Sequence, residues 1–176
     1  MTTTRSVRVE PASLLPLHWG YYPSRYVAGL ALLISSTVGL QGANTYTLFL
    51  LGLSTLAHAA GWIVLPARGP RRAWVVAPNV AVVWILLTGP GTTWALVVPF
   101  LCWLLIRQRP ALSYLAVLPV LAMGWVVSHV FQEYRGMPYA LGLMAVAVIG
   151  SAWLARWIAG IGRAPRIPRP LRANAQ

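Results

Sequence analysis

The chain contains very few acidic residues, no lysine and one cysteine. Its 176 residues include two glutamates, Glu10 and Glu133, and no aspartate, and all 14 basic residues are arginines. With so few carboxylates, general acid/base catalysis and divalent-metal catalysis have few residues to use. Cys102 alone supplies no intrachain disulfide, CxxC redox pair or thiolate zinc site. These absences argue against most classes of enzyme.

Catalytic motifs are also missing from the sequence. It contains no Ser-His-Asp set, no H-E-x-x-H motif and no glycine-rich loop that would cradle a phosphate. We therefore predict no metal site and no cofactor, and we interpret the chain as non-enzymatic in preference to an enzyme. Nucleic acid is not an expected partner, because no basic stretch is interleaved with aromatic residues on which bases stack.

Long apolar runs dominate the sequence. Hydrophobic side chains make up 58% of it and charged ones 9%, whereas a soluble domain carries about 25% charged residues. The run from Thr45 to Leu65 has no formal charge and is long enough to cross a hydrocarbon core of about 30 Å as a helix. We therefore predict an all-α integral membrane protein.

The positions of the arginines predict how the chain crosses the membrane. Short cytoplasmic loops carry the excess of arginine and lysine. If six transmembrane helices form three antiparallel hairpins with the N and C termini cytoplasmic, only Arg135 among the 14 arginines falls outside. This predicts a cytoplasmic N-terminal segment with an interfacial aromatic stretch (1–24), a six-helix domain (25–158) and a basic cytoplasmic tail (159–176). The predicted spans are 25–41, 45–65, 73–89, 91–107, 111–131 and 138–158.

The region 73–107 has two interpretations. Gly89, Pro90 and Gly91 divide it into two short apolar runs, which form either two full spans with an outer turn or a re-entrant hairpin. Both begin and end on the same side, so the arginines do not separate them. Irregular backbone at membrane depth needs protein around it, and this requirement favours two spans.

One candidate polar site lies within the predicted membrane domain. His58 is the only histidine deep in a span, and an antiparallel hairpin places Asn79 at a similar depth, with Ser151 of the sixth span near the same level. Intramembrane ionisable groups serve as proton relays or ligand contacts. The alternative, which we favour, is that neutral His58 bonds to Asn79 or to a serine and holds helices together.

A second candidate cluster lies at the outer end of the fifth span. His129 and Glu133 are four residues apart and would share a helix face, with Arg135 close by. Two such ligands permit metal binding or acid/base chemistry but do not close a metal site. We favour an interfacial ion pair between Glu133 and Arg135.

Small residues recur every four positions on the first and sixth spans, where they allow close helix packing. These stripes are Ala31, Ser35 and Gly39, and Ala147, Ser151, Ala155 and Ala159. In the tail, arginines alternate with prolines and are expected to contact anionic lipid headgroups. These arginines are Arg163, Arg166, Arg169 and Arg172.

The combined interpretation is a small multi-pass protein of the cell (inner) membrane. Its expected role is that of a non-enzymatic subunit or accessory partner of a membrane assembly. The expected partners are a bilayer with anionic headgroups and another membrane protein or a second copy of this chain. The alternative is a small transporter or permease with a polar site near His58 and Asn79, in which Pro78, Pro99 and Pro119 bend the third, fourth and fifth spans.

Overall fold

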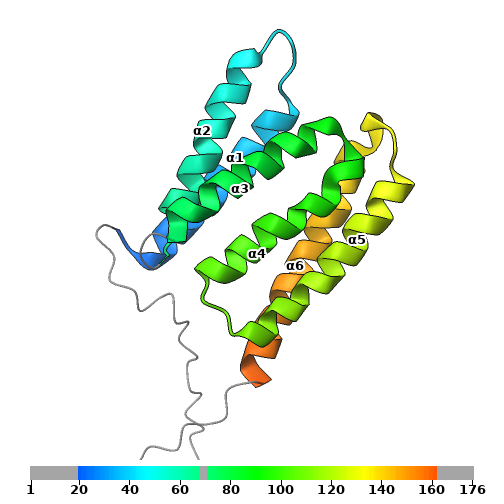
Figure 1. Cartoon of the computed structure of the whole chain (residues 1–176). Coiled ribbons are helices and arrows are strands. Elements are labelled where there is room, and N and C mark those ends of the chain that lie inside the picture. Colours follow the sequence, from blue (N-terminus) through cyan, green and yellow to red (C-terminus); the bar gives the residue numbers. More distant parts are fainter. Residues whose placement is uncertain (1–19, 68–70, 162–176) are drawn as a thin grey trace, which may run out of the picture.

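The computed structural model describes residues 20–67 and 71–161, with the side chains of 71, 72 and 161 excepted. Within these ranges every regular element is helical and six of the elements are α-helices, so the prediction of an all-α fold with six helices is confirmed (Figure 1). The α-helices are α1 Tyr22–Gln41, α2 Leu48–Val64, α3 Arg71–Ile85, α4 Val97–Ile106, α5 Val117–Val130 and α6 Met137–Ile161. The 3-10 segments are η2 Leu86–Thr88, η3 Pro90–Leu96, η4 Ala111–Ala116 and η5 Tyr134–Gly136.

Prolines explain where two of the α-helices begin. Pro99 and Pro119 are each the third residue of an α-helix, α4 and α5, and each helix continues a 3-10 segment. A proline has no N–H, and its ring displaces the carbonyl four residues earlier, so it is tolerated in the first turn of an α-helix but not deeper. Pro78 is different, because it lies in the interior of α3.

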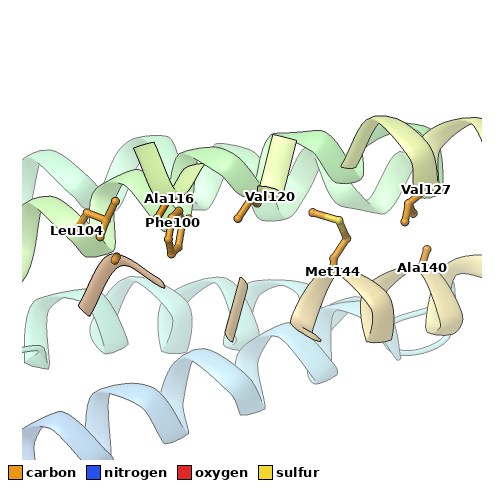
Figure 2. Packing of buried hydrophobic residues seen from close by; sticks show 8 residues of the cluster. Phe100, Leu104, Ala116, Val120, Val127, Ala140 and Met144 are labelled. Atoms are coloured by element: carbon orange, nitrogen blue, oxygen red, sulfur yellow. The ribbon is translucent and has the colours of Figure 1, made fainter. Parts of the chain in front are cut away.

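The helices pack as a hairpin and a bundle joined by α3. Helix α1 packs extensively with α2 alone, α2 also packs on α3, and α3 packs on α4. The α1–α2 hairpin therefore lies on one side of α3, and η3, α4, α5 and α6 lie on the other (Figure 1). The bundle holds the largest buried apolar cluster, in which side chains of α4 and α5 meet those of α6 (Figure 2). Its buried residues are Phe100, Leu104, Ala116, Val120, Val127, Ala140, Met144 and Ala155.

Two glycines determine how closely α1 and α2 approach. A Cβ atom on Gly29 would lie 2.9 Å from the Leu65 side chain and 3.1 Å from the carbonyl oxygen of Gly61. A Cβ atom on Gly61 would lie 2.9 Å from Leu33 and 3.1 Å from the carbonyl oxygen of Gly29. The two backbones are thus in contact at a reciprocal glycine pair, which is a packing mode used by helices in membranes.

The outer faces of the bundle are strongly apolar. The segments Ala111–Val130 and Tyr134–Gly160 are long and apolar enough to cross a membrane, with mean hydropathies of 1.9 and 1.7. Shorter apolar helical segments cover Leu48–Val64, Ala73–Thr88 and Pro90–Ile106. Large side chains that remain exposed include four tryptophans with at least 65% of their surface accessible: Trp74, Trp125, Trp153 and Trp157.

Candidate functional site

His58 lies in a buried hydrogen-bonded chain between α1 and α2. Its Nε2 atom accepts a hydrogen bond from the indole N–H of Trp62 at 3.2 Å, and its Nδ1 atom is 3.0 Å from the hydroxyl oxygen of Ser36. Because Nε2 accepts, the proton of the neutral ring belongs on Nδ1, which donates to Ser36. The Ser36 hydroxyl then donates to the carbonyl of Leu33 at 2.9 Å. The side-chain polar atoms of His58, Trp62 and Ser36 therefore all have hydrogen-bond partners.

Helical spacing explains why these residues meet. His58 and Trp62 are four residues apart on α2 and share one face. Ser36 projects from the facing side of α1, where it is 2% exposed. A gap too small for a water molecule lies beside His58, between Leu40 of α1, Thr55 of α2 and residues of α3. His58 therefore makes a polar contact between α1 and α2, beside a small gap where these helices meet α3.

The other two members of the predicted intramembrane site lie apart from this chain. Asn79 is fully buried on α3; its amide donates to the carbonyl of Val75 and lies beside the Cys102 thiol of α4. Ser151 is also buried, but on α6, which packs mainly on α5, η3 and η4. Neither side chain hydrogen-bonds to His58 within the described ranges.

The predicted outer cluster does not form a shared helix face. Helix α5 ends at Val130, and Phe131 has an extended backbone, so Glu133 falls beyond the helix that carries His129. His129 instead stacks on Trp125 at 4.5 Å between ring centroids, and its Nδ1 atom is 2.8 Å from the Trp125 carbonyl oxygen. Glu133 and Arg135 are both exposed and form no ion pair with each other. Within residues 20–67 and 71–161, no three His, Cys, Asp or Glu side chains gather as metal ligands.

The small-residue stripes have different surroundings. On α6, Ser151, Ala155 and Ala159 are buried and Ala147 is half-buried, and the hydroxyl of Ser113 donates to the carbonyl of Ala155 at 3.1 Å. On α1, Ala31 and Ser35 are exposed, and the packed side of that helix carries Gly29, Ser36 and Leu40 instead. A Cβ atom on Gly39 would still meet the Ser54 hydroxyl of α2.

Two arginines that the sequence did not single out lie at the end of the hairpin where α1 begins and α2 ends. Arg25 is 3% exposed, and its Nε–H donates to the carbonyl of Val64, the last residue of α2, at 3.1 Å. This contact caps a carbonyl that has no partner within its own helix. Arg107, which follows α4, places its guanidinium 4.3 Å from the ring centroid of Tyr26 and 5.1 Å from that of Trp103.

A cavity lies beside the Arg107 guanidinium, and we call it the arginine-end cavity. It is lined by residues of α1, of the end of α2 and of α4, and its volume of about 10 Å³ is no more than one water molecule needs. These are Tyr22, Tyr26, Leu65, Pro66, Trp103, Ile106 and Arg107. In the sequence, Trp103 lies one turn before Arg107, and Tyr22 and Tyr26 flank Arg25, although only the structure brings these aromatics together.

Several expectations concern residues outside the described ranges. They include most of the N-terminal segment 1–24 and the tail arginines Arg163, Arg166, Arg169 and Arg172. Comparison with protein-family models, with curated proteins and with solved structures finds no match. The proposals below therefore rest on the geometry of this chain alone.

Proposed function

We propose that this chain is a small multi-pass protein of the cell membrane that serves as a non-enzymatic subunit of a larger membrane assembly. Its six helices cross the bilayer as three hairpins, with both termini cytoplasmic. The observation that carries the proposal is the outer face of α6, which is apolar, contains Gly142 and Gly150, and is largely uncovered by the other residues in 20–67 and 71–161.

Burial supports the membrane location. A core helix of a soluble protein is mostly buried, yet only 28% of the apolar window of Ala111–Val130 and 17% of that of Tyr134–Gly160 is buried. An aqueous surface made of such helices would expose far more contiguous apolar area than soluble monomers do. A hydrocarbon environment removes this conflict, because lipid chains cover apolar side chains at no cost.

The position of the α3–α4 turn supports two crossing helices over a re-entrant hairpin. Gly89, at the tip, lies against the ring of Tyr134 in the loop before α6. The Tyr134 hydroxyl is in turn 3.4 Å from the Gln41 side chain at the end of α1. The tip therefore lies level with the α1–α2 turn and the α5–α6 turn, which we propose to lie outside. The two arms of the hairpin are α3 with η2 and η3 with α4, and each extends over the full height of the bundle.

Exposed glycines on α6 support a protein partner. Gly142 and Gly150 are exposed, and a Cβ atom on either would meet nothing within 4 Å. A glycine in a helix interior costs roughly 0.5–1 kcal/mol relative to alanine, and here no contact with the part of the chain that the structure describes offsets that cost. They lie on the same outer side of α6 as the exposed Val146, Ile149 and Trp153. Close approach of another helix gives these glycines a role, because glycines let helix backbones meet in lipid.

The partner is tested by extracting the tagged protein in native lipid particles and identifying the proteins that accompany it. We expect one stoichiometric partner or a second copy, retained by the wild type and lost from the double variant Gly142→Leu, Gly150→Leu. Ala122→Leu on α5 is the matched control, since Ala122 is exposed on a different helix. Recovery of the wild-type chain alone would overturn the proposed role.

The topology is tested separately by chemical labelling. Gly91 is exposed beside the proposed outer turn with open space around it, so Gly91→Cys is expected to fold. In a Cys102→Ser background, we expect this cysteine to react with a membrane-impermeant thiol reagent in intact cells. Protection from the reagent, in a protein found in the membrane fraction, would favour the re-entrant hairpin.

The alternative, a transporter with its site at His58, receives less support from the geometry. Both ring nitrogens of His58 have partners within the chain, and the neighbouring gap is too small for a water molecule, whereas ligand pockets begin at roughly 300 Å³. His58→Ala separates the two functions: a folded, abundant and inactive protein would favour transport.

A further inference from the structure

The exposed side of α6 carries a charged residue at the end of the helix that we place outside. The 3-10 segment η5 runs directly into α6, and its first residue, Tyr134, lies on the packed side against Gly89 and Gln41. Successive residues of a 3-10 helix point a third of a turn apart, and Arg135 is exposed. Because Arg135 precedes Gly142 by seven residues, about two turns, both lie on the outer side of the helix.

Two opposite charges lie together at this end without satisfying each other. Glu133 and Arg135 are both exposed, and neither side chain makes an ion pair or a hydrogen bond with the described residues. Glu133 is also the one acidic residue within the described ranges. Since the two side chains carry both signs two residues apart, this end of the chain is electrostatically complementary to a second copy of itself.

Insertion in a bilayer restricts how two copies meet. All copies of one chain take the same orientation, which the arginines set. Two α6 helices that meet are therefore parallel and related by a two-fold axis along the membrane normal, so that the same patch is used on both copies. Such an axis brings the two outer ends to one level, where each copy supplies one carboxylate and one guanidinium. A different protein would need to carry both charges at this depth.

The apolar part of the same face suits a close crossing of two helices. Gly142, Val146 and Gly150 recur every four residues, and all three are exposed. Rows at this spacing favour a right-handed crossing of about −40°, with Val146 near the closest point and a glycine on either side of it. Trp153 and Trp157 are exposed further along α6, where helices that cross at this angle diverge and leave room for large side chains.

We propose that two copies of this chain pair through the outer face of α6, with Arg135 of each copy bonded to Glu133 of the other. The proposal rests on the membrane location and the partner face proposed above, and it names a second copy as the partner. The glycines permit the close approach, whereas the charges fix how the two helices are aligned, because charge complementarity contributes more to specificity than to affinity.

The test is disulfide cross-linking in native membranes, in a Cys102→Ser background. Val146→Cys places one cysteine per chain near the expected closest point, and a disulfide forms only where two Cα atoms come within about 7 Å. Leu121→Cys is the matched control, because it is exposed on α5, nine residues from the outer end of that helix, as Val146 is on α6. We expect a covalent dimer from Val146→Cys and none from Leu121→Cys under the same oxidant.

Charge reversal tests why the partner is a second copy. In the Val146→Cys protein, Arg135→Glu places like charges together. We expect the dimer yield to fall about threefold or more at low ionic strength, because two ion pairs are lost at once. Adding Glu133→Arg to Arg135→Glu restores both pairs with their signs exchanged and is expected to restore the dimer. A loss that the double reversal does not repair would overturn the reciprocal pairing.

The outcomes separate this proposal from the proposed function. Equal cross-linking of Leu121→Cys, or no cross-linking of Val146→Cys, would overturn the second copy as the partner. The proposed function survives that result if a different protein accompanies the tagged wild-type chain and is lost from Gly142→Leu, Gly150→Leu. Absence of the wild-type chain from the membrane fraction would instead refute the proposed function itself.

Discussion

The reciprocal glycine contact between α1 and α2 predicts that glycine-to-alanine substitutions at two positions of α2 change the stability of the protein in opposite directions. Replacing Gly61 by alanine places a methyl group 2.9 Å from Leu33 and 3.1 Å from the carbonyl oxygen of Gly29. Leu33 can change rotamer, but the carbonyl belongs to the backbone of α1 and moves only if the helices separate. Gly52, nine positions earlier on α2, has no described residue within 4 Å of its would-be Cβ atom. The two substitutions share their chemistry and differ in surroundings.

The magnitudes follow from two opposing contributions. Alanine is favoured over glycine in a helix interior by roughly 0.8–1 kcal/mol, and this gain applies at both positions. Overpacking of a close contact costs typically 1–3 kcal/mol and applies at Gly61 alone. We therefore expect Gly52→Ala to stabilise the protein by up to about 1 kcal/mol and Gly61→Ala to destabilise it by up to about 2 kcal/mol, the difference between the two contributions.

The assay is equilibrium unfolding in mixed detergent micelles, followed by far-ultraviolet circular dichroism. The double variant Gly29→Ala, Gly61→Ala provides an internal check. Once one methyl group has separated the helices, the second costs little, so the two effects are expected to be less than additive. A Gly61→Ala protein as stable as Gly52→Ala would refute the close contact between the two backbones.

Three further predictions test other contacts. Gly124→Ala is expected to destabilise the protein by up to about 2 kcal/mol in the same unfolding assay, because its Cβ atom would lie 2.7 Å from the Trp94 backbone. Trp62→Phe removes the donor to His58 and leaves a buried acceptor unpaired, so we expect a loss of about 1–3 kcal/mol; an unchanged midpoint would contradict the hydrogen bond. His129→Ala, at an exposed position, is expected to change stability by less than about 0.5 kcal/mol, and a larger loss would give the outer histidine a structural role.

The helices themselves could be predicted because each apolar run is long and separated from the next by glycine, proline or arginine. What could not be predicted is the rotation of each helix about its axis. Helix α1 carries small residues on two sides, and the sequence favoured the side with Ala31 and Ser35, whereas Gly29 and Ser36 are on the packed side. Both sides are apolar enough for lipid, so hydropathy does not distinguish them.

The polar contacts, too, could be predicted only where they do not depend on how a helix is rotated. Hydrogen bonding of His58 to a serine was one interpretation available from the sequence, and the bond to Ser36 fits it. The spacing of His58 and Trp62 could have identified the second partner, whereas the distance between Ser36 and His58 depends on how α1 is rotated. The end of α5 at Val130 lies one residue from the predicted end of the fifth span. The shared helix face of His129 and Glu133 was wrong because it required the helix to continue past that end.

The packing of α1 also bears on how the chain is assembled. Its extensive contacts are with α2, the next helix along the sequence, and the glycine pair that brings them together is complete once Gly61 has been synthesised. Local contacts form fast, and domains begin to fold from the N-terminal side during synthesis. In the bilayer proposed above, the first hairpin is therefore able to insert as a finished pair and to present Trp62 and Leu65 as a surface on which α3 and α4 then pack.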